Sequence, residues 1–317
     1  MAMSNYPGGF ADGVMIRGIP LTMAHPGKVF WVGNATAAIL PGQKSPSDGN
    51  QGTFNDPFST LDYAIGKCTA SRGDIIMVKP GHAENISAAS GITVDVAGIA
   101  IVGLGTGTLR PKFSFITAAT ATMVVSAANV SFYNIQWEAN FADVAIGLDV
   151  SGVDGLSFDS CYFTEAGADL NYAIVVDLAT GADDISFNKC KFITNDIANT
   201  SHINGVAHAG FYVSDSLFYA NTAQTVVTGL IATSGNATNV DIRDSVFRSN
   251  VDGALWVDFN GTANSGVVRN CYVSSLDIAG ATSTGDFTGG HFFECYVSGE
   301  ADAFGLVGGG GVVYNNA

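Results

Sequence analysis

Seven short segments of the chain share one pattern of hydrophobic and polar residues. They begin at residues 130, 156, 185, 211, 240, 266 and 290, so consecutive segments start 24 to 29 residues apart. In the segment ISFNKCKF (185–192), apolar and polar residues alternate, but two residues instead of one separate Phe187 from Cys190. Alternation indicates a strand with one buried face, and the extra residue predicts a corner at Asn188–Lys189.

Aligned on this pattern, the segments predict three files of inward side chains. The two flanking files contain mainly Phe, Val and Ile, whereas the middle file, which begins at Ile135, consists mainly of small residues. Six members of the middle file form the predicted core ladder: Cys161, Cys190, Ser216, Ser245, Cys271 and Cys295. Four of the five cysteines lie in this ladder, which favours reduced, packed thiols over a disulfide framework or redox chemistry.

A third apolar run follows each pair of strands, for example at 146–150 and 174–178. Three strands per repeat predict an all-β fold, a single-stranded parallel β-helix of about nine coils. The apolar face of 59–68, preceded by Ser59 or Thr60 as N-cap, predicts a short helix that caps the first coil. The expected organisation is an extended N-terminal arm (1–45), the β-helix (46–304) and a Gly-rich tail (305–317).

Charge divides the chain unevenly and excludes some partners. The 317 residues carry 13 basic and 28 acidic side chains, a net charge of −15, and most of this excess lies after residue 112. A chain this acidic lacks the cationic footprint that nucleic acid requires. The sequence contains no run of 18 apolar residues, so it predicts no membrane span. Hydrophobic residues make up 47% of the chain, which excludes extensive disorder.

Two stretches resemble known families. Residues 57–65 (PFSTLDYAI), followed by 73–81 (GDIIMVKPG), resemble the first turn of pectate-lyase-like right-handed β-helix proteins. The whole chain, including residues 8–32, is similar to the β-helix decoration (cement) proteins of tailed-phage heads. That resemblance implies a homotrimer, made in the host cytoplasm, that binds the major capsid protein on the outer capsid surface and stabilises the head without being an enzyme. Candidate capsid contacts in the arm are Arg17, Ile19, Phe30 and Trp31.

Enzymatic chemistry is the alternative, as a phage tailspike or secreted lyase or hydrolase acting on acidic polysaccharide. Asp183, Asp184 and His208 loosely match the paired carboxylates and histidine of β-helix hydrolases, although turn positions before the strand at Ile185 explain both aspartates better. The sequence shows no spaced group of metal ligands. It also shows no cofactor motif, since Gly103-x-Gly105-x-Gly107 precedes no helix and so does not predict a dinucleotide site. A non-catalytic carbohydrate-binding or adhesin module is a third hypothesis, and binding of a host glycan stays open.

Overall fold

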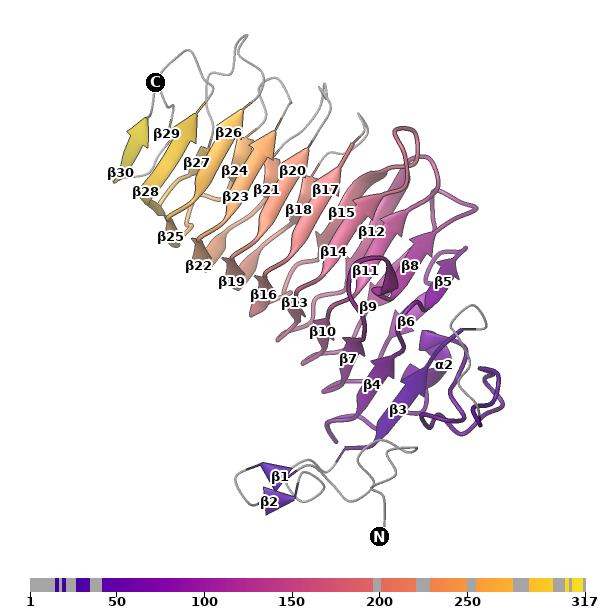
Figure 1. The fold of residues 1–317 in the computed structure, drawn as a ribbon. Helices are drawn as coiled ribbons and strands as arrows, with labels where there is room; N and C mark the ends of the chain where they lie inside the picture. The colour runs from indigo at the N-terminus through magenta and orange to yellow at the C-terminus, as the bar shows by residue number, and fades with distance from the viewer. Residues whose placement is uncertain are drawn as a thin grey trace.

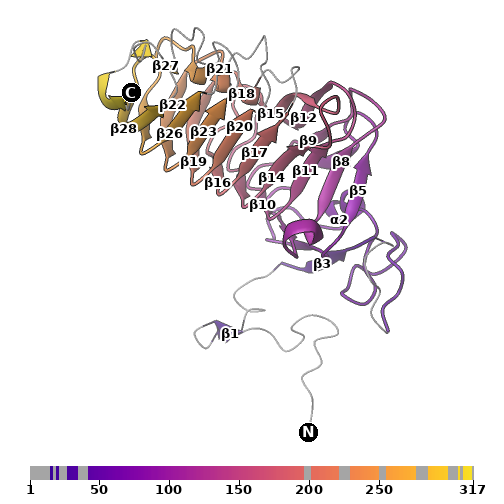
Figure 2. The same ribbon diagram turned by 45° about the horizontal axis from the view of Figure 1, so that its top comes forward.

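The computed structural model describes residues 15–16, 19–20, 27–34, 42–195, 201–220, 229–249, 255–275, 285–298, 306–307 and 310–315. Within these residues the chain winds into a long rod of stacked turns (Figures 1 and 2). Each turn contributes three strands, and each strand pairs in parallel with its counterpart in the next turn. The predicted single-stranded parallel β-helix is therefore confirmed.

Two strands of each turn meet at a corner and together build one 19-stranded sheet. We call the strands before the corner the first limb: β4 (Ile75–Val78), β7 (Ala100–Gly103), β10 (Ser131–Tyr133), β13 (Ser157–Asp159), β16 (Ile185–Asn188), β19 (His208–Ser214), β22 (Ala237–Arg243) and β25 (Gly266–Arg269). The strands after it are the second limb: β5 (Ala83–Ile86), β8 (Lys112–Phe115), β11 (Gln136–Ala139), β14 (Tyr162–Glu165), β17 (Lys191–Thr194), β20 (Leu217–Ala220), β23 (Val246–Ser249) and β26 (Tyr272–Ser275).

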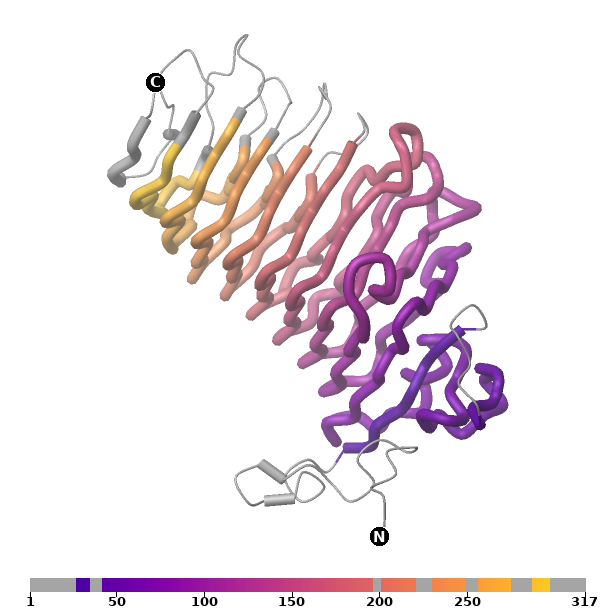
Figure 3. Tube along the Cα trace, in the orientation of Figure 1, coloured from indigo at the N-terminus to yellow at the C-terminus, as the bar shows by residue number. Residues whose placement is uncertain are grey.

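The third strand of each turn belongs to a separate nine-stranded sheet. Its members are β6 (Ile92–Val94), β9 (Met123–Val125), β12 (Val144–Val150), β15 (Tyr172–Leu178), β18 (Ser201–Gly205), β21 (Gly229–Thr233), β24 (Leu255–Phe259), β27 (Gly285–Phe287) and β29 (Leu306–Val307). The Cα trace in Figure 3 shows the turns lying one on another. Because every strand repeats the direction of the one beneath it, equivalent side chains form straight files along the rod.

The corners between the limbs occur where the sequence predicts them. The second corner residue of each turn adopts the left-handed backbone conformation, with φ between 49° and 56°: Asn134, Ser160, Lys189, Asp215, Asp244, Asn270 and Glu294. Asn and Asp tolerate this conformation because their short side chains hydrogen-bond locally. One residue in this conformation redirects the chain while the side chains on both flanking strands continue to face inward.

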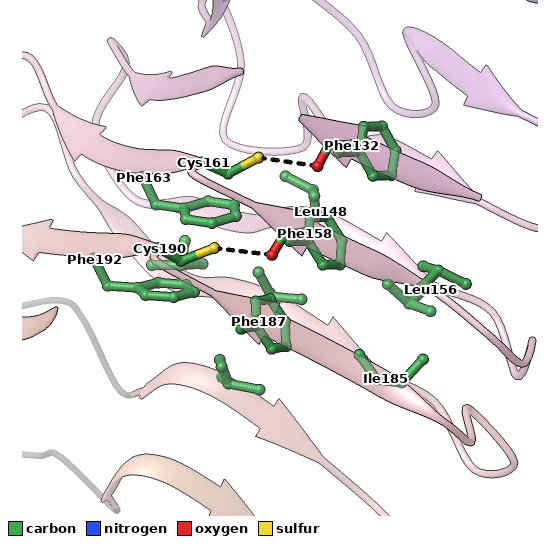
Figure 4. Close-up of a cluster of buried hydrophobic side chains, with 14 of the residues drawn as sticks. Phe132, Leu148, Leu156, Phe158, Cys161, Phe163, Ile185, Phe187, Cys190 and Phe192 are labelled. Atoms are coloured by element: carbon green, nitrogen blue, oxygen red, sulfur yellow. Dashed lines mark hydrogen bonds between the residues drawn. The ribbon is translucent and has the colours of Figure 1, made fainter. Parts of the chain in front are cut away.

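The interior contains the predicted files in the predicted register. Phe132, Phe158 and Phe187 are Cα partners on successive turns, and their rings stack at 5.1 and 4.8 Å between centroids. In the other flanking file, Phe163 and Phe192 stack at 4.4 Å (Figure 4). Parallel stacking follows from strand spacing, since rings on neighbouring strands lie about 4.8 Å apart. These buried rings hold the turns together.

Cys161, Cys190, Cys271 and Cys295 are all free and buried between the two aromatic files. The sulfur atoms of Cys161 and Cys190 donate to the carbonyl oxygens of Phe132 and Phe158 on the preceding turns (Figure 4). In the same ladder, Ser216 Oγ accepts the N–H of Cys190. Burial raises the pKa of the Cys190 thiol well above its usual range, so this ladder provides packing and short-range hydrogen bonds.

A short helix, α2 (Leu61–Ile65), covers the first turn, as the sequence predicts. The Thr60 hydroxyl accepts the N–H of Tyr63 at its start, and Asp48 accepts the N–H groups of Ser59 and Thr60. Leu61, Ala64 and Ile65 are buried, so the helix closes the end of the core. Among the described residues, no helix is long and apolar enough to cross a membrane.

The ends of the chain differ in part from the expected organisation. Strand β3 (Val29–Val32), inside the expected arm, pairs in parallel with β4 and so belongs to the sheet. Strands β1 (Met15–Ile16) and β2 (Ile19–Pro20) form a separate antiparallel pair. At the other end, β28 (His291–Ser298) spans both limbs and pairs with β30 (Gly310–Asn315), inside the expected tail. The solenoid therefore extends into both terminal segments.

Candidate functional site

The outward side chains of the second limb also form files along the rod. One file contains Lys112, Gln136, Tyr162, Lys191 and Leu217 on β8, β11, β14, β17 and β20. Alternation along each short strand fixes this arrangement, because the residue next to an inward phenylalanine must point outward. Tyr162 precedes the inward Phe163, and Lys191 precedes the inward Phe192. The fold thus brings together polar side chains that are about 25 residues apart in the sequence.

Tyr162 lies between two cations. The guanidinium carbon of Arg110 is 3.3 Å from the centroid of the Tyr162 ring, and Lys191 Nζ is 5.0 Å from it. Burial raises the pKa of Tyr162, but a hydrogen bond with Lys191 and the positive charges of Arg110 and Lys191 more than offset this, so the pKa lies below its usual value. The two cations stabilise the phenolate form of this tyrosine.

Arg110 reaches Tyr162 from a loop that leaves the first limb after β7. The loop contains a short 3₁₀ helix, η1 (Gly107–Leu109), and returns at Pro111, whose carbonyl accepts the N–H of Gln136. The Asn134 amide donates to the carbonyls of Gly103 and Gly105, which fixes the start of this loop. A Cβ at Gly103 would lie 2.3 Å from the Asn134 carbonyl oxygen, so only glycine permits this close approach.

The charge of Arg110 is not neutralised by any carboxylate in the part of the chain that the structure describes. Its Nε and Nη1 atoms are buried and have no hydrogen-bond partner there. By contrast, Lys112 Nζ contacts Glu138 Oε1 at 2.7 Å, and the Ser114 hydroxyl donates to the same oxygen. Because these two atoms are buried, Arg110 acts on an anion at the surface through its uncompensated positive charge, beside the second cation, Lys191.

We define the outer strip as the outward positions of β14, β17, β20, β23 and β26. Its members are Tyr162, Thr164, Lys191, Ile193, Leu217, Tyr219, Val246, Arg248, Tyr272 and Ser274. These ten positions include two cations and no carboxylate, in a chain with 28 acidic residues. Arg248 packs over the Tyr219 ring at 5.1 Å, a second pairing of a cation with a tyrosine. The strip is therefore an uncharged to positive surface on an acidic protein.

Three aspartates lie in one file of the nine-stranded sheet. Asp149 and Asp177 are Cα partners on neighbouring turns, and Asp258 lies three strands further along the same file. Burial, together with the charge of Asp177, raises the pKa of Asp149. Asn204 donates to Asp177 at 2.5 Å, so this file is held by hydrogen bonds between turns. This acidic file and the outer strip therefore lie on different sheets of the rod.

The sequence-based candidates for hydrolysis are not arranged as a catalytic group. His208 is only 4% exposed, and its Nδ1 atom bonds to the carbonyl of Ala182. Asp183 accepts the backbone N–H of Ala209, and Asp184 occupies a left-handed turn position with φ of 53°. Burial lowers the pKa of His208, which keeps its ring neutral. A polysaccharide outside the rod cannot reach this histidine, so the resemblance to a hydrolase site is not realised in space.

Two of the candidate capsid contacts pack on the rod itself. Phe30 lies 6.0 Å from Phe58 between ring centroids, and Trp31 meets the edge of Phe54 at 4.9 Å. Both residues belong to β3, so they support the first turn of the solenoid and are not part of a free arm. Arg17 lies outside the described residues, and Ile19 is described only by its backbone pairing in β2. The capsid role, the homotrimer, the major capsid protein as partner and the virion location stay predictions.

Tyr162 and Arg110 were not among the residues selected from the sequence. The signal that could have identified Tyr162 is the outward position just before the inward file of Phe163 and Phe192. Across four repeats, this position is occupied by Gln136, Tyr162, Lys191 and Leu217. Arg110 gives no repeat signal, because its loop interrupts the pattern. Within the described ranges, no group of three or more His, Cys, Asp or Glu side chains could hold a metal ion.

Comparisons with known proteins find likeness in fold. No family model matches the chain, and no curated protein matches it either. Among solved structures, pectate lyase Pel9A matches with a TM-score of 0.50 and 17% identity, over 90% of this chain and 81% of its own. A rhamnogalacturonan lyase matches with a TM-score of 0.49 and 13% identity, over 91% and 87% of the two chains. The right-handed, pectate-lyase-like β-helix is thus established.

The match to pectate lyase Pel9A corrects one expectation from the sequence. The sequence predicts that the chain is not an enzyme, but a solved structure of the same fold carries the name of a polysaccharide lyase. That prediction is therefore wrong as an exclusion, because a fold shared with a lyase gives no ground for excluding an enzyme. At 17% identity, however, the likeness is one of fold, and any activity must be argued from the side chains on the rod.

Proposed function

We propose that this protein is a polysaccharide lyase that binds an acidic polysaccharide of uronic acids on the outer strip and cleaves it by β-elimination. One observation carries the proposal: Arg110, Lys191 and Tyr162 meet on the carboxylate-poor face of a chain with a net charge of −15. A surface of this kind attracts a polyanion, whereas the remainder of the acidic protein repels one.

The residue types match the chemistry of β-elimination on a uronate. The carboxylate at C5 makes the neighbouring C–H weakly acidic, and neutralising that carboxylate is the main requirement for removing the proton. Arg110 supplies a positive charge that no carboxylate compensates among the described residues, and Lys191 supplies an ammonium group on the adjacent turn. Lys112 lies three strand steps from Lys191 in the same file, or about 14 Å at strand spacing. Lys112 is already paired with Glu138, so Lys191, and not Lys112, is the ammonium group available to a bound uronate.

The pectate lyase of the same fold supports this reading only by analogy, since its name indicates action on an acidic polysaccharide. The outer strip supplies the independent argument, because its charge is opposite to that of the whole chain. Tyr219 with Arg248 lies further along the strip and extends the cationic surface by about 10 Å beyond Lys191.

Replacing Lys191 with glutamine tests the proposal. Lys191→Gln is expected to weaken binding of polygalacturonate or alginate about tenfold, because one charge-assisted hydrogen bond to a carboxylate is lost. Binding is measured by calorimetry, and cleavage by the ultraviolet absorbance of the unsaturated product. Arg243→Gln is the matched control, since Arg243 is an exposed cation at a first-limb corner that pairs with Asp241.

The two variants change the net charge of the protein equally but at different faces. They therefore distinguish the effect of a local binding site from the effect of net charge. Equal loss of affinity in both would contradict a site on the outer strip. If the wild-type protein binds and cleaves neither polymer, the proposed function is wrong.

A further inference from the structure

We propose that Tyr162 is the base that removes the C5 proton in this elimination, with Lys191 as the acid that protonates the leaving oxygen. The assignment rests on the proposed function and names the residues that perform its chemical step. It is argued from the position of the Tyr162 ring, from its two cationic neighbours and from the other titratable groups of the outer strip.

Other groups that could accept a proton are excluded by their contacts. His202 and His208 are buried inside the rod, and His82 is buried against Glu84. Glu138, an outward carboxylate on the neighbouring strand β11, is already paired with Lys112, and Glu165 at the end of β14 is buried. Tyr162 lies on the outer face, only partly buried, in the same file as Lys191. It therefore combines a titratable oxygen with access from the polymer side.

The cations around Tyr162 make its phenolate form accessible. Arg110 stacks on the ring at 3.3 Å and Lys191 lies 5.0 Å from the ring centroid, so a negative charge on the phenol oxygen is stabilised from two directions. The lowered pKa of Tyr162 agrees with this geometry. Tyr219 has one cation above its ring, Arg248 at 5.1 Å, so Tyr162 has the more positive environment of the two.

The step balances without any further reactant. The Tyr162 phenolate takes the proton from C5, and the C–H electron pair forms the double bond between C4 and C5. The C4–O bond to the next sugar breaks, and the leaving oxygen receives a proton from the Lys191 ammonium. Solvent then returns a proton to Lys191 and removes one from Tyr162. Arg110 does not titrate, so its positive charge stays beside the Tyr162 ring throughout.

Tyr162→Phe tests the assignment while keeping the ring that packs under Arg110. We expect product formation from polygalacturonate or alginate to fall at least a hundredfold, which is the usual contribution of a general base, with affinity changed less than threefold. The control is Tyr133→Phe, because Tyr133 is 48% exposed on the first limb, outside the outer strip. This control should retain wild-type turnover.

A second readout needs no substrate. In a spectrophotometric pH titration, the tyrosinate absorbance of the wild-type protein should contain a component whose midpoint lies below the ordinary tyrosine pKa of about 10. Tyr162→Phe should remove this early-titrating component, and Tyr133→Phe should leave it in place.

The outcomes distinguish the base from the function. The assignment is supported if Tyr162→Phe loses both turnover and the early-titrating tyrosinate component, and Tyr133→Phe loses neither. Turnover within twofold of wild type in Tyr162→Phe, or an unchanged titration curve, overturns it while leaving the lyase function standing. Absence of cleavage by the wild-type protein on both polymers overturns the function and the base together.

Discussion

Tyr162 shows how one position in a repeat acquires a chemical environment that its equivalents lack. The same file continues through Leu217, Val246 and Tyr272, where no cation lies over a ring. What differs is the loop carrying Arg110, together with a lysine on the next turn. A regular scaffold therefore supplies the position, and two irregular neighbours supply the electrostatics.

Asp74 is a buried carboxylate whose protonation should change the stability of the fold. Its buried carboxylate accepts the backbone N–H groups of Lys28 and Thr69, and it pairs with Arg72 at 2.6 Å. Burial raises the pKa of Asp74, but these hydrogen bonds more than offset it, so the pKa lies below its usual value. The contact joins the segment before β3 to the first turn.

Asp74→Asn should lower the free energy of unfolding by about 2 kcal/mol at neutral pH, because charge-assisted hydrogen bonds are lost. A carboxylate with a lowered pKa stabilises the fold at pH values above its unfolded pKa of about 4, and this contribution disappears as pH falls through the lower folded value. The difference between wild type and variant should therefore shrink in acid. Urea unfolding at neutral and acidic pH measures it, and a difference that stays constant with pH would contradict the account.

Much of the residue-level structure follows from the sequence because the repeat is read seven times. The corner at Asn188–Lys189 and the cysteine ladder both came from one break in alternation, and both are present. The environment of Tyr162 could not be predicted in this way. Its cation from Arg110 depends on a loop of one turn, and a pattern shared by many turns contains no information about a single insertion.

Among the elements, the loop after β7 has the largest consequence for the site. It leaves the sheet at Gly103, forms η1 and returns at Pro111, so Arg110 stands beside the second limb. Asn134 fastens the loop from the next turn with two hydrogen bonds, at 2.9 and 2.8 Å. The corner residue of one turn thus positions a functional side chain of the turn before it.

Asn134→Gly tests the two hydrogen bonds from the Asn134 amide to the loop, because glycine permits the left-handed backbone but lacks the amide. We expect the affinity for polygalacturonate to fall several-fold, since Arg110 loses its fixed position. Asn270→Gly is the matched control: Asn270 occupies the same corner five turns further along and donates to Asp244. Calorimetric titration of both variants gives the comparison. An equal effect of the two substitutions would show that the loop does not position the site.

The N-terminal elements explain why the expected arm differs from the structure. Val29–Val32 reads as an isolated apolar run, since no repeat precedes it in the sequence. In the fold, it pairs with β4 and covers the first edge of the sheet together with α2. An unpaired edge is a site for unwanted association, so a terminal apolar segment gains more by adding to the sheet than by extending into solvent.

For the whole molecule, the main feature is that one acidic file and the carboxylate-free outer strip lie on different sheets. The file of Asp149, Asp177 and Asp258 lies on the nine-stranded sheet, whereas the outer strip on the second limb contains no carboxylate. Reading charge along the chain suggested a neutral front and an acidic body. Winding the chain into a solenoid converts that linear distribution into faces, because every turn contributes to each of them.

A bound polyanion should lie along the outer strip. A crystal structure of the protein with a short oligogalacturonate tests this position most directly. We predict sugar density on the second limb over Tyr162 and Lys191, with a carboxylate of the ligand within hydrogen-bond distance of Arg110. Ligand density only on the nine-stranded sheet or at the ends of the rod, with the outer strip bare at saturating ligand, would contradict the account.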